Sequence, residues 1–365
     1  MRPGPQLERF RQKLLAWYRA NRRDLPWRAA VPKAGACRRD WYRVWLAEVM
    51  LQQTRITAVV PYYTKFLERF PGVSALAAAP EAEVLRYWAG LGYYSRARNL
   101  HRAAREITAS WHGEFPRDYD SALRLPGIGR YTAAAVLSIA FGVPLAVVDG
   151  NVARVLARVA GLRGELRAPR TWSRLARDAR TFLDRESAGD WNEGLMELGE
   201  TVCTPQSPRC AECPVSRFCK ARRAGLQEKI PAPRRNRRQV SVEIAAAVLT
   251  DSRGRALLVR DPGAHDAVLF SRMWQFPAVE VAIDAAKELK SHLAATLGIT
   301  AGDLRELSPA RHAVTFRNVK LLPYLGRMKQ SPKGHRRRLV ALDRLSQLPV
   351  SSATRKIAEA ALRAL

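Results

Sequence analysis

Apolar side chains recur at spacings of three and four residues through the first two-thirds of the chain, which is the period of an amphipathic helix. In the first such segment Leu7, Phe10, Leu14 and Trp17 fall on one stripe. Proline, glycine and aspartate separate further stripes of this kind. They predict helices over Tyr42–Thr54, Thr57–Arg69, Glu81–Ala89, Ser95–Trp111, Tyr131–Phe141, Val152–Ala160, Trp172–Leu183 and Asn192–Val202. We therefore expect an all-α domain over residues 1–225.

The pattern changes after residues 226–240, a segment rich in arginine and proline without apolar period, which is typical of an exposed linker. Shorter apolar runs follow over residues 241–365 and predict a small α/β domain. They indicate a hairpin turning at Asp251–Gly254, a helix over Ala285–Leu297, a strand over Lys320–Leu325 and a terminal helix over Ser352–Leu365. The chain is thus expected to be multidomain, all-α first and α/β second.

The net charge of the chain indicates which class of molecule it binds. The 365 residues include 62 Lys and Arg against 33 Asp and Glu, which gives a net charge of +29. Such an excess favours a nucleic acid, although part of it could reflect general arginine usage along the chain. No apolar run reaches the roughly 18 residues of a membrane span, and no signal peptide is seen. We expect no membrane contact and a cytoplasmic, nucleoid-associated monomer.

Four of the five cysteines form a cluster with the spacing C-x6-C-x2-C-x5-C, namely Cys203, Cys210, Cys213 and Cys219. Four thiolates on one loop can hold a cubane iron–sulfur cluster, whereas zinc sites more often pair two short arms across a longer gap. A 4Fe–4S cluster is the favoured interpretation, and zinc or four unligated thiols are the alternatives. The fifth, Cys37, is interpreted as a loop thiol or a partly buried thiol.

A second feature is the segment LPGIGR, which predicts a tight turn between two helices. Gly127 and Gly129 would let the backbone approach a phosphate, and Arg130 would open the second helix, whose first amides favour an anion. An ordinary glycine-rich turn is the alternative. Asp149 follows twenty residues after Gly129 and suits the N-cap of the next helix. A capping carboxylate held by amides is expected to stay ionised and could stabilise a nearby cation.

The order LPGIG, VVDGNV and the cysteine spacing resembles the helix-hairpin-helix DNA glycosylase superfamily. Within it, LPWR, AEVMLQQT, GLGYYSRARNL and MELG resemble the adenine DNA glycosylase (MutY) family over nearly all of residues 5–225. The resemblance implies excision of adenine mispaired with 8-oxoguanine or guanine in double-stranded DNA.

The resemblance also implies catalytic roles. Glu48 would protonate adenine and later assist water, and Asp149 would stabilise the sugar cation, with Tyr131 and Asn151 assisting by hydrogen bonds. Because Glu48 lies on an apolar helix, burial could raise its pKa. A surface glutamate is the alternative. Bifunctional relatives carry a lysine just after the hairpin, where this chain has Tyr131, so strand cleavage should be weak or absent.

Further residues would contact the DNA if the resemblance holds. Gln53 and Tyr93 would wedge into the duplex, and Gln52 could share that role. The pocket that receives the extruded adenine would be lined by Trp27, Arg28, Leu51 and Glu197. Each of these side chains could instead belong to an ordinary core or surface.

The C-terminal domain resembles the Nudix-related domain that reads 8-oxoguanine in this family. The acidic run of a Nudix hydrolase is replaced by SHLAATLGI, so diphosphate hydrolysis is not expected. Thr315, within Val314–Phe316, stands where the family reads the lesion, but the family's following histidine is missing. A plain hairpin is the alternative here.

Two other functions stay open from the sequence. One is a glycosylase for another base, or a lyase of the endonuclease III kind. The other is a non-catalytic iron–sulfur DNA-binding protein, which would not need paired Glu48 and Asp149. The role of Val31–Arg39, which lengthens the loop after LPWR, is not decided by the sequence.

Overall fold

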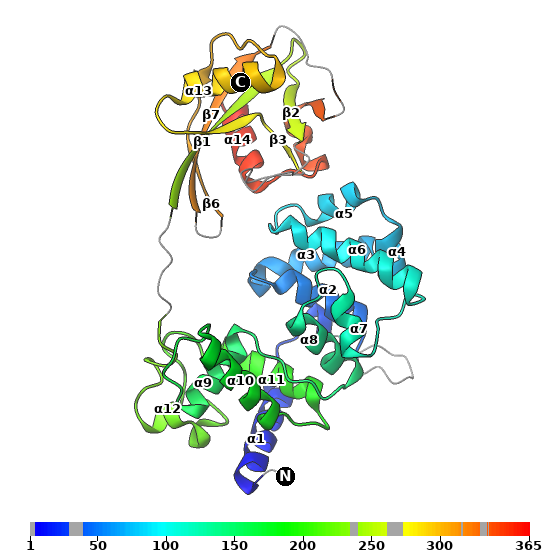
Figure 1. The fold of residues 1–365 in the computed structure, drawn as a ribbon, viewed down its shortest axis with the longest axis vertical. Coiled ribbons are helices and arrows are strands. Elements are labelled where there is room, and N and C mark those ends of the chain that lie inside the picture. The colour runs from blue at the N-terminus through cyan, green and yellow to red at the C-terminus, as the bar shows by residue number, and fades with distance from the viewer. Residues whose placement is uncertain are drawn as a thin grey trace. The chain divides into compact units, whose positions relative to one another are not determined.

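The computed structural model describes residues 4–28, 39–233, 240–260, 273–314, 317–328, 334 and 336–365. They form two compact units, shown as ribbons in Figure 1. The first consists of Met1–Ala79 and Ser95–Arg235, and the second of Pro80–Tyr94 and Asn236–Leu365. No helix among the described residues is both long and apolar enough to cross a bilayer.

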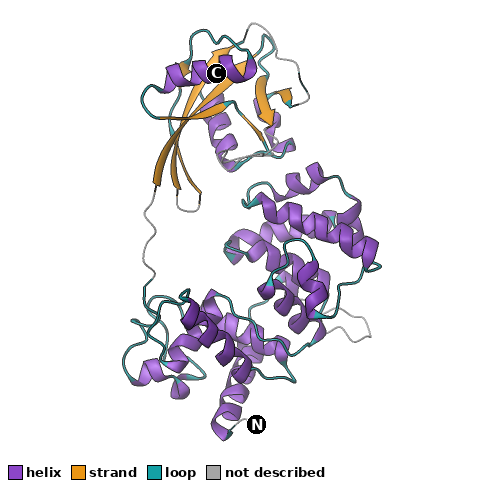
Figure 2. Cartoon of the chain, viewed as in Figure 1, coloured by secondary structure: helices purple, strands orange, loops and turns teal. Residues whose placement is uncertain are grey.

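The first unit is helical (Figure 2). Its helices are α1 (Pro5–Asn21), α2 (Trp41–Leu51), α3 (Ile56–Arg69), α4 (Val73–Ala78), α6 (Tyr94–Ser110), α7 (Tyr119–Arg124), α8 (Arg130–Phe141), α9 (Gly150–Ala160), α10 (Pro169–Phe182), α11 (Ala188–Thr201) and α12 (Lys220–Arg223). The predicted helix over Glu81–Ala89 also forms, as α5 (Glu81–Trp88), and clusters with the second unit. The expected helices are all present. The largest differences in their bounds are three or four residues: α2 ends at Leu51 rather than Thr54, α10 begins at Pro169 rather than Trp172, and α11 begins at Ala188 rather than Asn192.

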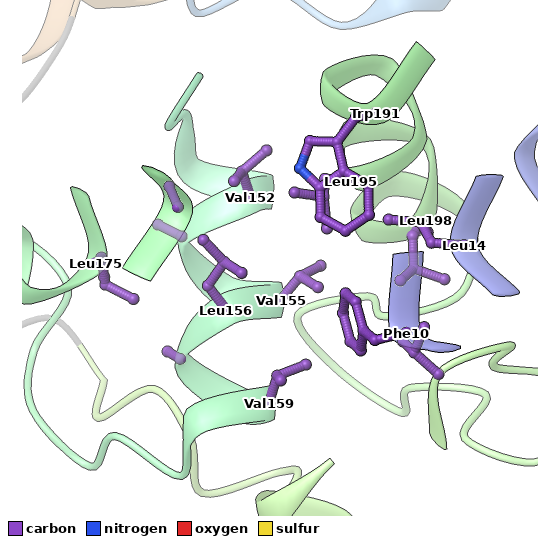
Figure 3. Close-up of a cluster of buried hydrophobic side chains, with 14 of the residues drawn as sticks. Phe10, Leu14, Val152, Val155, Leu156, Val159, Leu175, Trp191, Leu195 and Leu198 are labelled. Carbon is purple, nitrogen blue, oxygen red and sulfur yellow. The ribbon is translucent and has the colours of Figure 1, made fainter. Parts of the chain in front are cut away.

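One hydrophobic core joins α1, α9 and α11 (Figure 3). Phe10 and Leu14 of α1 pack with Val155 of α9 and with Trp191 and Leu195 of α11. Because these side chains are almost fully buried, they fix the axis of α9 against its neighbours. The start of α9, where Asp149 lies, is positioned by this packing.

A glycine sets the distance between α9 and α11 near the start of α9. A Cβ atom built on Gly199 would lie only 2.7 Å from the Cβ of Asn151, closer than two carbon atoms can pack. The MELG motif therefore ends in a residue that lets α11 approach Asn151 directly.

The second unit contains a mixed sheet, which confirms the predicted α/β class. Its strands are β1 (Val240–Thr250), β2 (Ala256–Arg260), β3 (Trp274–Gln275), β4 (Ala278–Val281), β5 (Arg305–Glu306), β6 (Ala310–Val314), β7 (Arg317–Arg327) and β8 (Arg337–Val340). β1 and β7 pair in parallel, and the other pairs are antiparallel. The hairpin at Asp251–Gly254 is confirmed by the pairing of Thr250 with Ala256.

Two helices cover opposite faces of this sheet, α13 (Ala285–Leu297) and α14 (Ser352–Leu362). Alternate residues of β1 separate accordingly, since Ala247 packs with Leu293 of α13 and Val248 with Ile357 of α14. The carboxylate of Glu288, the one acid of α13, accepts hydrogen bonds from the backbone amides of Ala282, Ile283 and Asp284, just before its own helix.

Candidate active site

The predicted catalytic residues meet in one cavity of about 480 Å³ in the first unit. Its wall is built from the 3-10 helix Pro26–Arg28, from α2 and α8, and from the start of α9. Glu48, Tyr131, Asp149 and Asn151 all line it. Residues that are about a hundred positions apart in the chain are thus brought together by the packing of α2, α8 and α9.

Glu48 is a buried acid, with 8% of its surface exposed. It lies on α2, which begins where the carboxylate of Asp40 accepts hydrogen bonds from two backbone amides. Burial raises the pKa of Glu48 to about 7, although the hydroxyl of Tyr131 donates a 2.7 Å hydrogen bond to its carboxylate and opposes the rise. The predicted burial is confirmed, and the alternative of a surface glutamate is excluded.

Tyr131 follows directly from the glycine turn. It is the second residue of α8, which begins after Gly129, and its hydroxyl reaches Glu48. Burial and the neighbouring Glu48 hold the pKa of Tyr131 well above its ordinary value. The phenol therefore remains a hydrogen-bond donor at neutral pH.

Asp149 caps α9, as the sequence predicted. Its carboxylate accepts a 2.6 Å hydrogen bond from the backbone amide of Val152. The backbone amides lower the pKa of Asp149, as expected, but burial raises it by more, so that its pKa lies above the ordinary value. The electrostatic cost of burying the carboxylate in the cavity wall outweighs the hydrogen bonds of the cap.

Trp27, Arg28, Leu51 and Glu197, which were expected to line a base pocket, do line this cavity. Trp27 is buried, and its ring packs edge-on against Tyr63 with centroids 5.3 Å apart. Glu197 is 1% exposed and forms ion pairs with Arg28, at 2.9 Å, and with Arg23, at 2.6 Å. In this state both carboxylate oxygens of Glu197 are engaged.

The sequence did not reveal the rest of this charged network. Glu193 binds Arg28 at 3.1 Å and Arg39 at 2.9 Å, and all three side chains are largely buried. Arg39 is the one described residue of the segment Val31–Arg39. The one hint of this network in the sequence is that two acids, Glu193 and Glu197, lie four residues apart and therefore on one face of α11.

The two glutamines after α2 differ in environment. The side-chain amide of Gln52 donates a 3.3 Å hydrogen bond to the hydroxyl of Thr132 on α8, so Gln52 points inward. Gln53 is exposed and has a left-handed backbone, with φ of 58°. Gln53 is thus the more exposed of the two, and a wedge role shared by Gln52 stays a prediction.

The predicted helix-turn-helix over the LPGIG segment is confirmed by α7 and α8. Gly127 has φ of 75°, and a Cβ there would lie 2.6 Å from the Cβ of Asn99, so no larger residue fits. Gly129 is the N-cap of α8, and Arg130 is exposed beside it. The turn thus presents helix-start amides and a cation at the surface, which can bind phosphate.

Two further predicted residues lie outside the first unit. Tyr93 belongs to the second unit, is 40% exposed and has φ of 49°. Thr315 lies outside the described residues, between β6 and β7, which pair up to Val314 and Arg317.

The four clustered cysteines line one small cavity near the end of α9. No group of three or more His, Cys, Asp or Glu side chains in the described ranges could hold a single metal ion. The thiols instead surround a space, which suits a group of several atoms. Burial raises the pKa of the Cys213 thiol to about 12, so bound iron must supply the positive charge that keeps it deprotonated.

Arg158 connects this loop to α9. It is 2% exposed, and its guanidinium donates hydrogen bonds to the carbonyls of Cys203, Thr204, Pro205 and Ile230 and to the sulfur of Cys203. A second guanidinium, that of Arg154, donates to the Cys203 carbonyl at 2.9 Å and to the side chain of Asn151 at 2.9 Å. One helix thus carries contacts to both the cysteine loop and the catalytic cavity.

Two protein families match segments of the chain that contain the catalytic cavity and the cysteine cluster. Residues 46–177 match the HhH-GPD superfamily of base excision DNA repair proteins. Residues 203–219 match the iron–sulfur binding domain of endonuclease III, which confirms the expected iron–sulfur cluster, and the four cysteines within this match stay its predicted ligands.

Individual proteins of similar sequence are also base excision DNA glycosylases. The adenine DNA glycosylase of Homo sapiens is 46% identical over 224 residues, which cover 61% of this chain and 41% of that protein. The adenine DNA glycosylase of Mycolicibacterium smegmatis is 44% identical over 214 residues, covering 59% of this chain and 70% of that protein. The match thus spans about two-fifths of the mammalian relatives' length. Among solved structures, a thermostable thymine-DNA glycosylase superimposes with a TM-score of 0.53 at 29% identity, covering 60% of this chain and 97% of that one.

Proposed function

This chain belongs to the adenine DNA glycosylase family, and we propose that it hydrolyses the N-glycosidic bond of adenine mispaired with 8-oxoguanine or guanine in duplex DNA. The observation that carries the proposal is the hydrogen bond from Tyr131 to the buried Glu48, beside Asp149 in one cavity. Adenine is a poor leaving group unless it is protonated, so the site needs an acid that still holds its proton near neutral pH. Glu48, with a pKa of about 7, meets that need.

Asp149 supplies the second carboxylate. As the glycosidic bond breaks, positive charge develops on the sugar, and a carboxylate at the start of α9 stabilises it or forms a covalent intermediate, as in retaining glycosidases. Burial raises the pKa of Asp149, and positive charge on the sugar beside it would favour its ionised form. Asn151, held by Arg154, would assist by hydrogen bonding.

The reaction should stop at base removal. A lyase needs an amine nucleophile that attacks the sugar carbon, and the residue after the turn is Tyr131, whose hydroxyl is bound to Glu48. Weak or absent strand cleavage follows.

The substrate must reach the cavity as an extruded nucleotide, because the reacting bond is inaccessible inside a stacked duplex. The exposed turn at Gly127–Arg130 would hold the phosphate backbone, and Gln53 would fill the space that adenine leaves. When bound, the 4Fe–4S cluster would order the loop of its four cysteines, with Arg158 donating to Cys203. Recognition of 8-oxoguanine would fall to the second unit, through the segment that includes Thr315.

The test is single-turnover release of adenine from duplexes that carry adenine opposite 8-oxoguanine, guanine, cytosine or thymine. Release from the first two duplexes is expected. No release from either would contradict the adenine assignment. Release of thymine instead would favour a glycosylase of another specificity, and duplex binding without any release would favour a non-catalytic binder.

Asp149→Asn provides the matched variant, because asparagine can still accept the hydrogen bond from Val152 and cap α9. It should abolish release while duplex binding persists. Full activity would remove Asp149 from the mechanism.

A further inference from the structure

The turn that follows α2 contains a strained backbone conformation at Gln53. Gln53 has φ of 58°, a left-handed conformation that glycine or asparagine adopts far more readily than glutamine. It is also exposed, so packing of its side chain does not force this conformation. Strain of this kind persists only where the surrounding structure holds it.

Arg96 of α6 holds this turn. Its Nη1 atom donates hydrogen bonds to the carbonyls of Val49 and Met50, each at 3.0 Å, and to the carbonyl of Gln52. Its Nη2 atom donates to the hydroxyl of Thr54 at 3.2 Å. The last carbonyls of a helix have no partner within the helix, and a cation placed there also interacts favourably with the helix dipole. Arg96 therefore ends α2 at Leu51 and fixes the residues on both sides of Gln53.

The neighbouring glutamine completes the support. Gln52 donates to Thr132 of α8 at 3.3 Å, and the Thr54 hydroxyl donates back to the Gln52 carbonyl at 3.3 Å. The backbone is thus fixed directly before and after Gln53, while the Gln53 side chain itself stays at the surface.

The same helix also supports the phosphate-binding turn. Asn99 lies one helical turn after Arg96 on α6 and contacts Gly127, where a Cβ would lie 2.6 Å from that of Asn99. One rigid helix face thus sets the distance between the Gln53 turn and the Gly127–Arg130 turn. A wedge works only if it is in register with the backbone contacts that hold the duplex.

We propose that Arg96 is a positioning residue, which holds the strained turn after α2 so that Gln53 enters the duplex in register with the hairpin. This inference rests on the proposed action on duplex DNA. It assigns to Arg96 no contact with adenine and no part in proton transfer.

The test is a kinetic double-mutant cycle in the full-length chain. Arg96→Lys keeps the charge but loses the planar fork that reaches several acceptors at once. It should slow single-turnover adenine release by roughly 10-fold to 100-fold, the effect of a misplaced group near a reacting nucleotide. In a Gln53→Ala background the same substitution should change the rate by less than about twofold, because the side chain that Arg96 directs is gone. An equal effect in both backgrounds would show that Arg96 acts elsewhere.

A second measurement does not require cleavage of the glycosidic bond. A duplex with 2-aminopurine next to the mispaired adenine should gain fluorescence when the wild-type protein unstacks it, and Arg96→Lys should lose most of that gain. Failure of the wild type to release adenine would overturn the proposed function but leave this readout intact. Equal gains in wild type and Arg96→Lys, or no gain with either protein, would overturn the inference.

Arg102→Lys is the matched control, since Arg102 lies on the exposed face of α6, and it should leave both readouts unchanged. If Arg96→Lys does not fold, as judged by circular dichroism, Thr54→Val takes its place in the cycle. It removes one acceptor of Arg96 and the bond back to Gln52, so a smaller effect of the same pattern is expected, and an unchanged rate would contradict the inference.

Discussion

Replacing Glu48 by glutamine tests the electrostatics of the site in two independent ways. Glutamine keeps an oxygen that can accept the Tyr131 hydrogen bond, but it cannot ionise or donate a proton to adenine. Burial raises the pKa of Glu48 from 4.5 to about 7. One pKa unit corresponds to about 1.4 kcal/mol, so ionised Glu48 costs the folded state on the order of 3 kcal/mol.

The direction in which the free energy of unfolding changes with pH depends on whether the folded or the unfolded chain binds the Glu48 proton more tightly. Below pH 4.5 Glu48 is protonated in the folded and unfolded states, and its ionisation costs nothing. As the pH rises toward about 7, the unfolded chain releases the proton while the folded chain keeps it, so the free energy of unfolding falls. Above that value the loss is complete.

Glu48→Gln should therefore gain stability relative to wild type as the pH rises, by about 2 to 3 kcal/mol between pH 5 and pH 8. Urea unfolding followed by tryptophan fluorescence measures this, because seven of the nine tryptophans lie in the first unit, which contains Glu48. The exposed Glu114→Gln is the control and should show no such trend. A stability difference independent of pH would refute the raised pKa, and retained adenine release would refute the role of Glu48 as the acid.

Three further outcomes follow from the contacts of the site. Tyr131→Phe removes the hydrogen bond that lowers the pKa of Glu48, so the alkaline limb of the single-turnover pH profile should move to higher pH. Gly199→Ala would drive a Cβ to within 2.7 Å of Asn151 and should cost about 1–3 kcal/mol in urea unfolding, with slower adenine release. Arg158→Met strips buried donors from the cysteine loop and should reduce the cluster's absorbance per chain, with a stability loss of more than about 3 kcal/mol.

For each of these three variants, a specific result would contradict the prediction. An unchanged or acid-shifted profile in Tyr131→Phe would mean that its hydroxyl does not control the ionisation of Glu48. Wild-type stability in Gly199→Ala would show that α11 shifts without cost. Full cluster content and stability in Arg158→Met would show that the loop holds its shape without the guanidinium.

Much of the fold was predictable, because apolar spacing reports which face of a segment is buried. The helices of the first unit and the hairpin, helix and strand of the second were expected within a few residues. Several bounds differ by three or four residues, and the structure shows the cause for the end of α2. Local spacing extends that helix to Thr54, but Arg96, more than forty positions away, ends it at Leu51.

The candidate site was predicted only in part. Glu48, Tyr131 and Asp149 could be named because motif order marks them, and the four cysteines because their spacing does. Glu193 and Arg39 could not, since their partners are far away in the chain. The same holds for Arg154, whose link between Asn151 and Cys203 appears only once α9 and the cysteine loop are packed.

By itself, the sequence determined the class of each domain, the presence of an iron–sulfur cluster and the types of side chain at the site, because these depend on local spacing and residue identity. The tertiary structure alone decided their energetics. It made Glu48 a buried acid with a pKa of about 7, and it made Asp149 a carboxylate whose burial outweighs its cap. It also separated inward-pointing Gln52 from exposed Gln53. Burial and the direction of a side chain depend on neighbours that are distant in the chain, which no local pattern encodes.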